Sequence, residues 1–467
     1  MSIESIKVQQ YTTTTAHWRL TPGYLHEGRS DFESAHILLG RFLADRNSEY
    51  PLLEKELFAN DGIFEWGHAK PLEKVINSRP DLEFLLLHPN LLRNCITIIE
   101  PWEHVGLNAK GEDVRASKNV AYIAQKVADM DSVLLPVWST GVLDPEIVVP
   151  AINSGYAVVV KGGDPSTYDA STWTSPACPR EDMFALVEKL LISRSPTSAA
   201  AIFICVGHQL AAECHIRLIR RAVKEVLGTI SLDRDRSGMA LRSLQEVCQR
   251  IEAMGKTLEV KKRDGRVVAN GWNDQHFAVT RNELKEVGDR VLLPYQSPDG
   301  DALGIPWELI HAHDVTADSH EGVIDTTIQY EARVSIISMF HSDEVNEEAI
   351  LFANWAYRSI HDAIVPYRHI IAGSSLSWLI QLPDSIEILC STAEEDGEIV
   401  TECSATCIND KDFETKKIRR SFTCQFHPEL LSDLRAIGNS EAPSYSTLKK
   451  DDGVRLFIRL LYAGMQE

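Results

Sequence analysis

A cysteine stands where an apolar run meets the start of a helical pattern, in AIFICVGHQLAAE (201–213). The apolar half is typical of a buried strand, and the second half is typical of a helix start. A strand-to-helix turn with small residues around it is the geometry that lifts a nucleophile into a pocket. Cys205 occupies the nucleophile's position, and Gly207 follows two residues later. The pattern predicts a reactive thiol, although this stretch alone leaves open an inert buried cysteine.

A second group of reactive residue types lies near the carboxyl end, in IRRSFTCQFHPEL (418–430). In a strand, residues i and i+2 point to the same face, so His427 and Glu429 project together where the backbone is extended. Pro428 favours that conformation in the residue before it. A carboxylate beside an imidazole orients the ring and stabilises its protonated form. We therefore expect His427 to act as a base that Glu429 holds in place.

Alternating strands and helices position both groups. Short apolar runs at 95–101, 132–138, 156–163 and 200–207 are typical of successive strands, and the helical patterns between them lie at 116–130 and 181–193. This alternation predicts an α/β fold whose open, mostly parallel sheet carries helices on both faces. Open sheets of this class place their sites at the carboxyl ends of the strands, which is where Cys205 falls. Further helical patterns follow at 210–227 and 243–255, and Asp264-Gly265 predicts a hairpin turn.

Composition restricts the class of protein. The formal charge of −20, from 67 acidic and 47 basic residues, argues against a nucleic-acid partner. Nine cysteines, scattered along a long chain, favour a reducing compartment over a disulfide framework. No signal-like segment and no run of eighteen apolar residues is visible, so we expect a cytoplasmic protein without a membrane partner. The spacing of Cys403 and Cys407 lacks a second ligand pair, and we expect neither a metal nor a cofactor.

Taken together, Cys205-Val206-Gly207-His208-Gln209 and Gln425-Phe426-His427-Pro428-Glu429 resemble the two motifs of the class I (triad-type) glutamine amidotransferases. The order Cys, His, Glu is also that of the family. VVVKGGDPST (158–167) is similar to the glycine-rich turn of the family, and SMFHSDEV (338–345) is similar to its histidine-containing loop. The resemblance implies a flavodoxin-like sheet of the amidotransferase type.

The resemblance also implies a set of site residues. The implied catalytic residues are Cys205, His427 and Glu429, and the oxyanion hole is formed by backbone N–H groups of Gly163 and Val206. The implied substrate-binding residues are Gly162, Gln209, Phe340, His341 and Ser342.

The implied reaction is hydrolysis of the side-chain amide of glutamine. The Cys205 thiolate attacks the amide, ammonia leaves, and water hydrolyses the glutamyl thioester. Helix N-terminal N–H groups and the imidazolium both favour the thiolate. No phosphate-binding motif for ATP occurs, so we expect the ammonia acceptor on another chain, a synthase-type protein partner.

Two features depart from the family pattern. Phe203 stands where the family usually has glycine, which makes the approach to the elbow bulkier. The long separation between Cys205 and His427 implies an insertion at about 211–330. We therefore divide the chain into an N-terminal, partly helical extension (1–94) and an amidotransferase-like α/β domain (95–467) that contains the insertion.

Two other functions stay open from the sequence. One is a hydrolase of the same fold that acts on γ-glutamyl amides or peptides. The other is a non-catalytic, amidotransferase-like binding protein; the complete set of Cys205, His427 and Glu429 argues against it, and Phe203 and the insertion leave it open. Cys214-His215 is a second Cys–His pair, but adjacent helix residues point about 100° apart, so we expect both to be structural.

Overall fold

The computed structural model describes residues 95–102, 131–192 (except Asp164), 199–230, 237–262, 265–272, 277–295, 335–393, 399–411 and 418–429. It also describes single positions within 83–92, 120–124 and 453–460, and Leu232. The side chains of Asp131, Ser139, Ser237, 282–294, 335–340, Ser342, 409–411 and 418–420 are not described. Nearly all of the predicted extension (1–94) lies outside these residues.

A nine-stranded sheet forms the centre of the described structure, in the order β2-β1-β3-β4-β11-β10-β9-β7-β8. Its first five strands pair in parallel. They are β1 (Cys95–Glu100), β2 (Asp131–Pro136), β3 (Ala157–Val160), β4 (Ala200–Ile204) and β11 (Ile418–Cys424). Strands β1, β3 and β4 are buried along their whole length, as parallel strands covered on both faces must be. The four strand runs expected from the sequence are confirmed.

The other half of the sheet is antiparallel, which the sequence analysis did not anticipate. It contains β10 (Ile399–Lys411), β9 (Ile386–Ala393), β7 (Val279–Pro294) and β8 (Ser335–Val345). Strand β7 comes from the predicted insertion, yet it pairs with both β8 and β9. The described carboxyl part of that insertion therefore extends the main sheet. A small separate hairpin, β5 (Glu259–Lys261) with β6 (Val267–Asn270), turns at Gly265 as expected.

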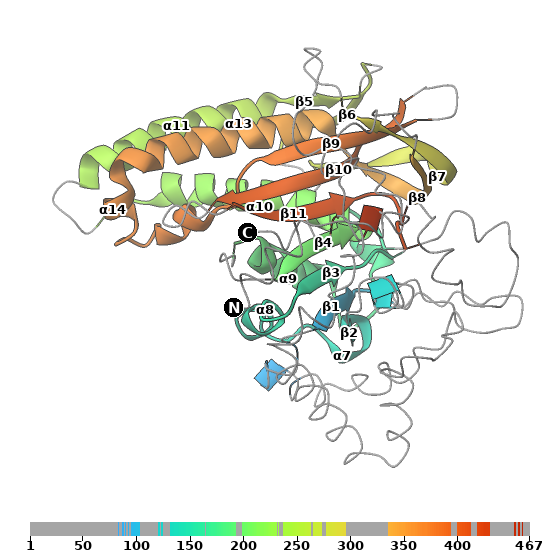
Figure 1. Cartoon of the computed structure of the whole chain (residues 1–467). Coiled ribbons are helices and arrows are strands. Elements are labelled where there is room, and N and C mark those ends of the chain that lie inside the picture. Colours follow the sequence, from blue (N-terminus) through green and yellow to red (C-terminus); the bar gives the residue numbers. More distant parts are fainter. Residues whose placement is uncertain are drawn as a thin grey trace, which may run out of the picture.

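Helices flank the sheet (Figure 1). The longer ones are α8 (Pro145–Ile152), α9 (Arg180–Ile192), α10 (Val206–Gly228), α11 (Ser237–Thr257) and α13 (Glu347–Ile364), and the short ones are α7 (Val137–Thr140) and α14 (Arg368–Ile371). Three-residue to five-residue 3-10 turns lie at Ala170–Thr172, Val365–Tyr367 and Ser377–Gln381. Helix α10 packs against α9, α11 and α13, and α11 lies beside α13 (Figure 1). The α/β class predicted from the sequence is confirmed.

Candidate functional site

Cys205 lies in a sharp turn between β4 and α10. Its φ of 53° makes it the only non-glycine residue with a positive φ in the described part of the chain. Its N–H donates to the Cys424 carbonyl at 2.7 Å, and its carbonyl accepts from the Gln209 N–H at 3.1 Å. Backbone strain of this kind costs about 1–3 kcal/mol and persists where the surroundings fix it. The turn therefore has the conformation of a nucleophile elbow.

Two glycines allow the elbow to sit close to β3. A Cβ on Gly162 would lie 2.6 Å from the Cys205 Cβ and 3.3 Å from its Sγ, and a Cβ on Gly207 would lie 2.5 Å from the Val160 carbonyl oxygen. Only glycine permits these approaches. Phe203, whose bulk differs from the family pattern, is fully buried in the core, so the elbow forms with that side chain packed inside the sheet.

His427 and Glu429 meet just after β11. The strand ends at Cys424, and the backbone bends and then turns at Pro428, so the extended conformation expected across His427-Pro428-Glu429 does not occur. The turn still brings His427 Nδ1 to 2.9 Å from Glu429 Oε1. Because β11 pairs with β4 in parallel, its end lies beside the elbow. The structure thus brings Cys205, His427 and Glu429 together.

Neighbouring charges determine the pKa values of His427 and Glu429. Burial alone would lower the pKa of His427, but the Cys205 thiolate, the Glu429 carboxylate and hydrogen bonds with both side chains raise it to about 10. Since Nδ1 is bonded to Glu429, Nε2 is the ring nitrogen left for Cys205. Burial would raise the pKa of Glu429, whereas Lys161 and then His427 lower it to about 2. The arrangement is a thiol, an imidazolium and a carboxylate in series.

Lys161 is the member of the cluster that sequence reasoning missed. Its Nζ lies 2.6 Å from Glu429 Oε1, and the two side chains are 5% and 0% exposed. Lys161 directly follows β3 and precedes Gly162-Gly163, and its N–H donates to the Ile99 carbonyl at 3.0 Å. The available signal was a lysine at the end of an otherwise apolar strand, where an ammonium must find a buried partner.

The predicted oxyanion donors come from two different elements. Val206 is the first residue of α10, and Gly163 is in the turn after β3. Among the described residues, neither N–H donates to a protein acceptor. Unpaired N–H groups at a helix N-terminus and in a glycine turn are suited to bind an anionic oxygen.

Gln209 is held in a buried amide network in the first part of α10. Its Nε2 donates to the Asp343 carbonyl at 2.8 Å and to Gln425 Oε1 at 3.2 Å. Gln425 Nε2 lies 3.8 Å from the Cys205 Sγ. Gln209 Oε1 is buried and accepts no hydrogen bond from the described residues. The network links Gln209 to the thiol through Gln425.

The β8 residues are placed less completely. His341 is buried, with Nδ1 3.0 Å from the Asp343 carbonyl and Nε2 3.4 Å from Thr401 Oγ1. Both ring nitrogens thus have partners within the sheet. Phe340 and Ser342 lie on the same strand, and their side chains are outside the described part.

The side chains of the second Cys–His pair, Cys214 and His215, bond to different parts of the protein. Cys214 Sγ donates to the Phe184 carbonyl at 3.6 Å, and His215 Nε2 lies 2.9 Å from the Asp384 carbonyl. Burial raises the pKa of Cys214 well above its usual range and lowers the pKa of His215 to about 4. The two side chains serve separate structural contacts, as expected.

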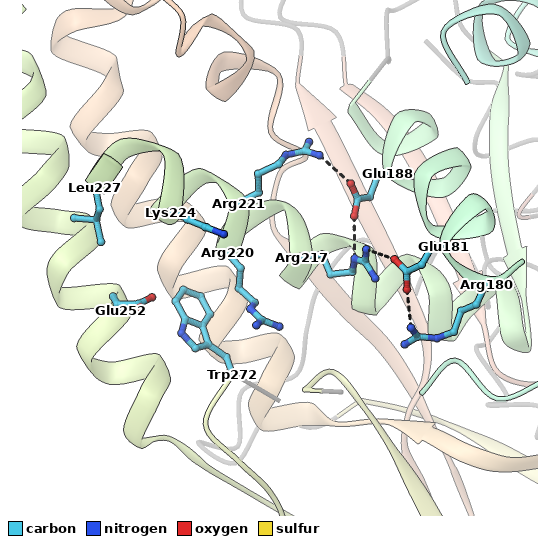
Figure 2. A pocket seen from close by; sticks show the side chains of 10 residues that line it. All are labelled: Arg180, Glu181, Glu188, Arg217, Arg220, Arg221, Lys224, Leu227, Glu252 and Trp272. Atoms are coloured by element: carbon cyan, nitrogen blue, oxygen red, sulfur yellow. Dashed lines mark hydrogen bonds and ion pairs between the residues drawn. The ribbon is translucent and has the colours of Figure 1, made fainter. Parts of the chain in front are cut away.

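A concavity of about 850 Å³ is lined by residues of α9, α10 and α11 and by Trp272 (Figure 2). Its charges are largely paired with one another: Arg217 bonds Glu181 and Glu188, and Arg221 also bonds Glu188. Arg180 bonds Glu181 and donates through Nε to the Thr167 carbonyl. The ion pairs join α9 to α10.

Neither the protein-family models nor the curated proteins compared with this chain give a match. No group of three or more His, Cys, Asp or Glu side chains suited to a metal occurs among the described residues. All nine cysteines are described, and none forms a disulfide. In the described part of the chain, no helix is both long enough and apolar enough to cross a membrane.

Proposed function

We propose that this chain is a cysteine amide hydrolase of the class I glutamine amidotransferase type, with the flavodoxin-like sheet of that family. One observation carries the proposal: Cys205, strained at the start of α10, lies within hydrogen-bonding contact of a histidine that a carboxylate orients. These are the parts of a nucleophile, base and orienting group.

In the proposed reaction, the Cys205 Sγ attacks the carbonyl carbon of the glutamine side-chain amide. The N–H groups of Gly163 and Val206 receive the negative charge that develops on the oxygen. His427 gives a proton to the nitrogen, the C–N bond breaks, and ammonia leaves a glutamyl thioester. A water then gives its proton to His427 and attacks the thioester, releasing glutamate and the thiol.

Substrate binding in this proposal uses the amide network. Gln209 Oε1 is a buried acceptor without a described partner, and it lies on the first turns of the helix that carries Cys205. An acceptor there suits the ammonium group of an amino-acid substrate. The ammonia would pass to an acceptor held by a synthase-type protein partner.

Ammonia release tests the proposal. The purified full chain is incubated with glutamine and, separately, with γ-glutamyl amides and peptides, and the released ammonia or amine is measured. Release from glutamine supports the glutaminase, whereas release only from γ-glutamyl compounds identifies the related hydrolase. If the folded protein cleaves neither glutamine nor γ-glutamyl compounds, both enzyme functions are contradicted and a non-catalytic binding protein is left.

A matched variant controls the assay. Cys205→Ser must abolish release, while Cys214→Ser, nine residues further along the same helix, must retain it. Equal activity in Cys205→Ser and the unmodified chain would trace the ammonia to another source.

A further inference from the structure

We propose that Lys161 is a positioning residue of the candidate triad, acting through Glu429 to fix the orientation and the charge of the His427–Cys205 pair. The inference rests on the proposed function for its kinetic consequence, but its geometry is independent of substrate.

The first support is the sharing of one oxygen. Glu429 Oε1 accepts from Lys161 Nζ at 2.6 Å and lies 2.9 Å from His427 Nδ1. A carboxylate that bonds only the imidazole can rotate about its side-chain torsions. With an ammonium fixed on the same oxygen, rotation would break two buried charge-assisted bonds at once. Lys161 therefore sets the direction from which Glu429 approaches the ring.

The second support is where Lys161 is anchored. Its backbone is tied to β1 through the Ile99 carbonyl, and the next two residues are Gly162, which touches Cys205, and Gly163. The end of β3 thus supplies both the lysine that holds Glu429 and the glycine turn next to Cys205. A shift of Lys161 would displace both sides of the site together.

The third support is charge balance. Cys205 and Glu429 act on His427, and burial and then the Glu429 charge raise the pKa of Cys424. Glu100 ends β1 at the same edge of the sheet, one position beyond the residue that pairs with Val160. Without Lys161, a buried carboxylate and a thiolate would face a single imidazolium. The lysine supplies the second positive charge that this burial requires.

Removal of that positive charge has a defined electrostatic sign. A buried cation lowers the pKa of neighbouring groups, so its loss raises the pKa of the Glu429 carboxyl and of the His427 imidazolium. A residue that only filled space would lower the rate without moving the pH dependence. The pH profile therefore separates a positioning role from packing.

The experiment measures the rate at which iodoacetamide alkylates Cys205, by mass spectrometry of the Cys205 peptide, from acidic to alkaline pH. The full chain is compared with Lys161→Met, which removes the charge, and with Lys161→Gln, which keeps a hydrogen-bond donor. Both neutral variants should shift the profile upward by about one pH unit or more, and Lys161→Arg should restore it. Lys189→Met is the matched control, since Lys189 also pairs with a glutamate at 2.5 Å, but in an ion pair between α9 and α8 whose glutamate is exposed.

An unchanged profile in folded Lys161→Gln or Lys161→Met overturns the inference, as does an equal shift in Lys189→Met. Hydrolysis of glutamine and γ-glutamyl compounds is measured in parallel. A shifted alkylation profile in a chain that hydrolyses neither leaves the inference standing and removes the proposed function. Hydrolysis by the full chain, with an unshifted alkylation profile in every Lys161 variant, supports the proposed function and removes the inference about Lys161.

Discussion

Helix α10 carries two buried Cys–His sites that differ in almost every respect but residue type. At its start, Cys205 meets His427, which lies just after β11 and is bonded to a carboxylate. Less than three turns later, Cys214 and His215 bond only to backbone groups. Both histidines are buried, yet the pKa of His427 is raised to about 10 and that of His215 is lowered to about 4.

This contrast teaches that burial does not determine reactivity. Burial disfavours the charged form at both sites, and the outcome depends on which charges are buried alongside. At the elbow, the charges of Cys205 and Glu429 reverse the effect of burial on His427, and Lys161 lowers the pKa of Glu429. At Cys214, burial and then the Glu188 charge raise the pKa of the thiol, and the Arg217 charge offsets this only in part, so the thiol stays neutral.

The largest expected effect comes from exchanging sulfur for oxygen at each site. Cys205→Ser should reduce ammonia release about 10⁴-fold or more, because a hydroxyl is a poor replacement for an activated thiolate. Cys214→Ser should leave the rate within a few-fold and cost about 1–3 kcal/mol of stability, since it buries a hydroxyl. Steady-state kinetics and urea unfolding measure both. Similar rate losses in the two variants would remove the distinction between the sites.

A smaller effect is expected from crowding the thiol. Gly162→Ala places a methyl group 2.6 Å from the Cys205 Cβ, so the elbow must shift, and the rate should fall about 100-fold. Gly228→Ala, at the far end of α10, meets nothing within 4 Å and should leave the rate unchanged. Kinetics together with circular dichroism check the pair. Full activity in Gly162→Ala would show that the close approach is not needed.

His427 and His215 should contribute opposite pH dependences to the free energy of unfolding. For His427, the raised pKa contributes stability that is fully present below about pH 6.5 and is lost as the pH rises through about 10. For His215, the lowered pKa contributes stability that is present above about pH 6.5 and is lost as the pH falls toward 4.

Urea unfolding across this range is compared for His427→Gln and His215→Gln. The first should flatten the alkaline decline and the second the acid decline. If both variants keep the pH dependence of the unmodified chain, the assigned protonation states are wrong.

The smallest effect is expected far from the triad on the same helix. Arg221 is exposed and pairs with Glu188 at 3.0 Å across to α9 (Figure 2). Arg221→Met should change the free energy of unfolding by at most about 1 kcal/mol and leave the rate unaltered. A loss of activity in Arg221→Met would show that the concavity lined by α9, α10 and α11 contributes to the reaction.

Much of this arrangement follows from local patterns in the sequence. The apolar runs predicted β1 to β4, because parallel strands covered on both faces are continuously apolar. The elbow was predicted from Cys205 and Gly207, and the pair of His427 and Glu429 from their spacing. Residues close in the chain, or ending at the same sheet edge, are within reach of such reasoning.

Contacts between distant parts of the chain could not be predicted from local sequence patterns. Nothing in the local pattern of β7 shows that it inserts between β8 and β9, since strand partners depend on register across distant segments. The pairing of Lys161 with Glu429 likewise joins residues 268 positions apart. A lysine after an apolar strand signals a buried partner without identifying it.

Labelling with a glutamine-analogue electrophile tests the central claim most directly. The full chain is treated with the reagent, and the adduct is located by intact mass and peptide mapping, with Cys205→Ala as the control. We predict one adduct per chain, on Cys205, none on Cys214, and none in the variant. A folded chain that stays unmodified at Cys205, or that is labelled without preference among its cysteines, would contradict the account.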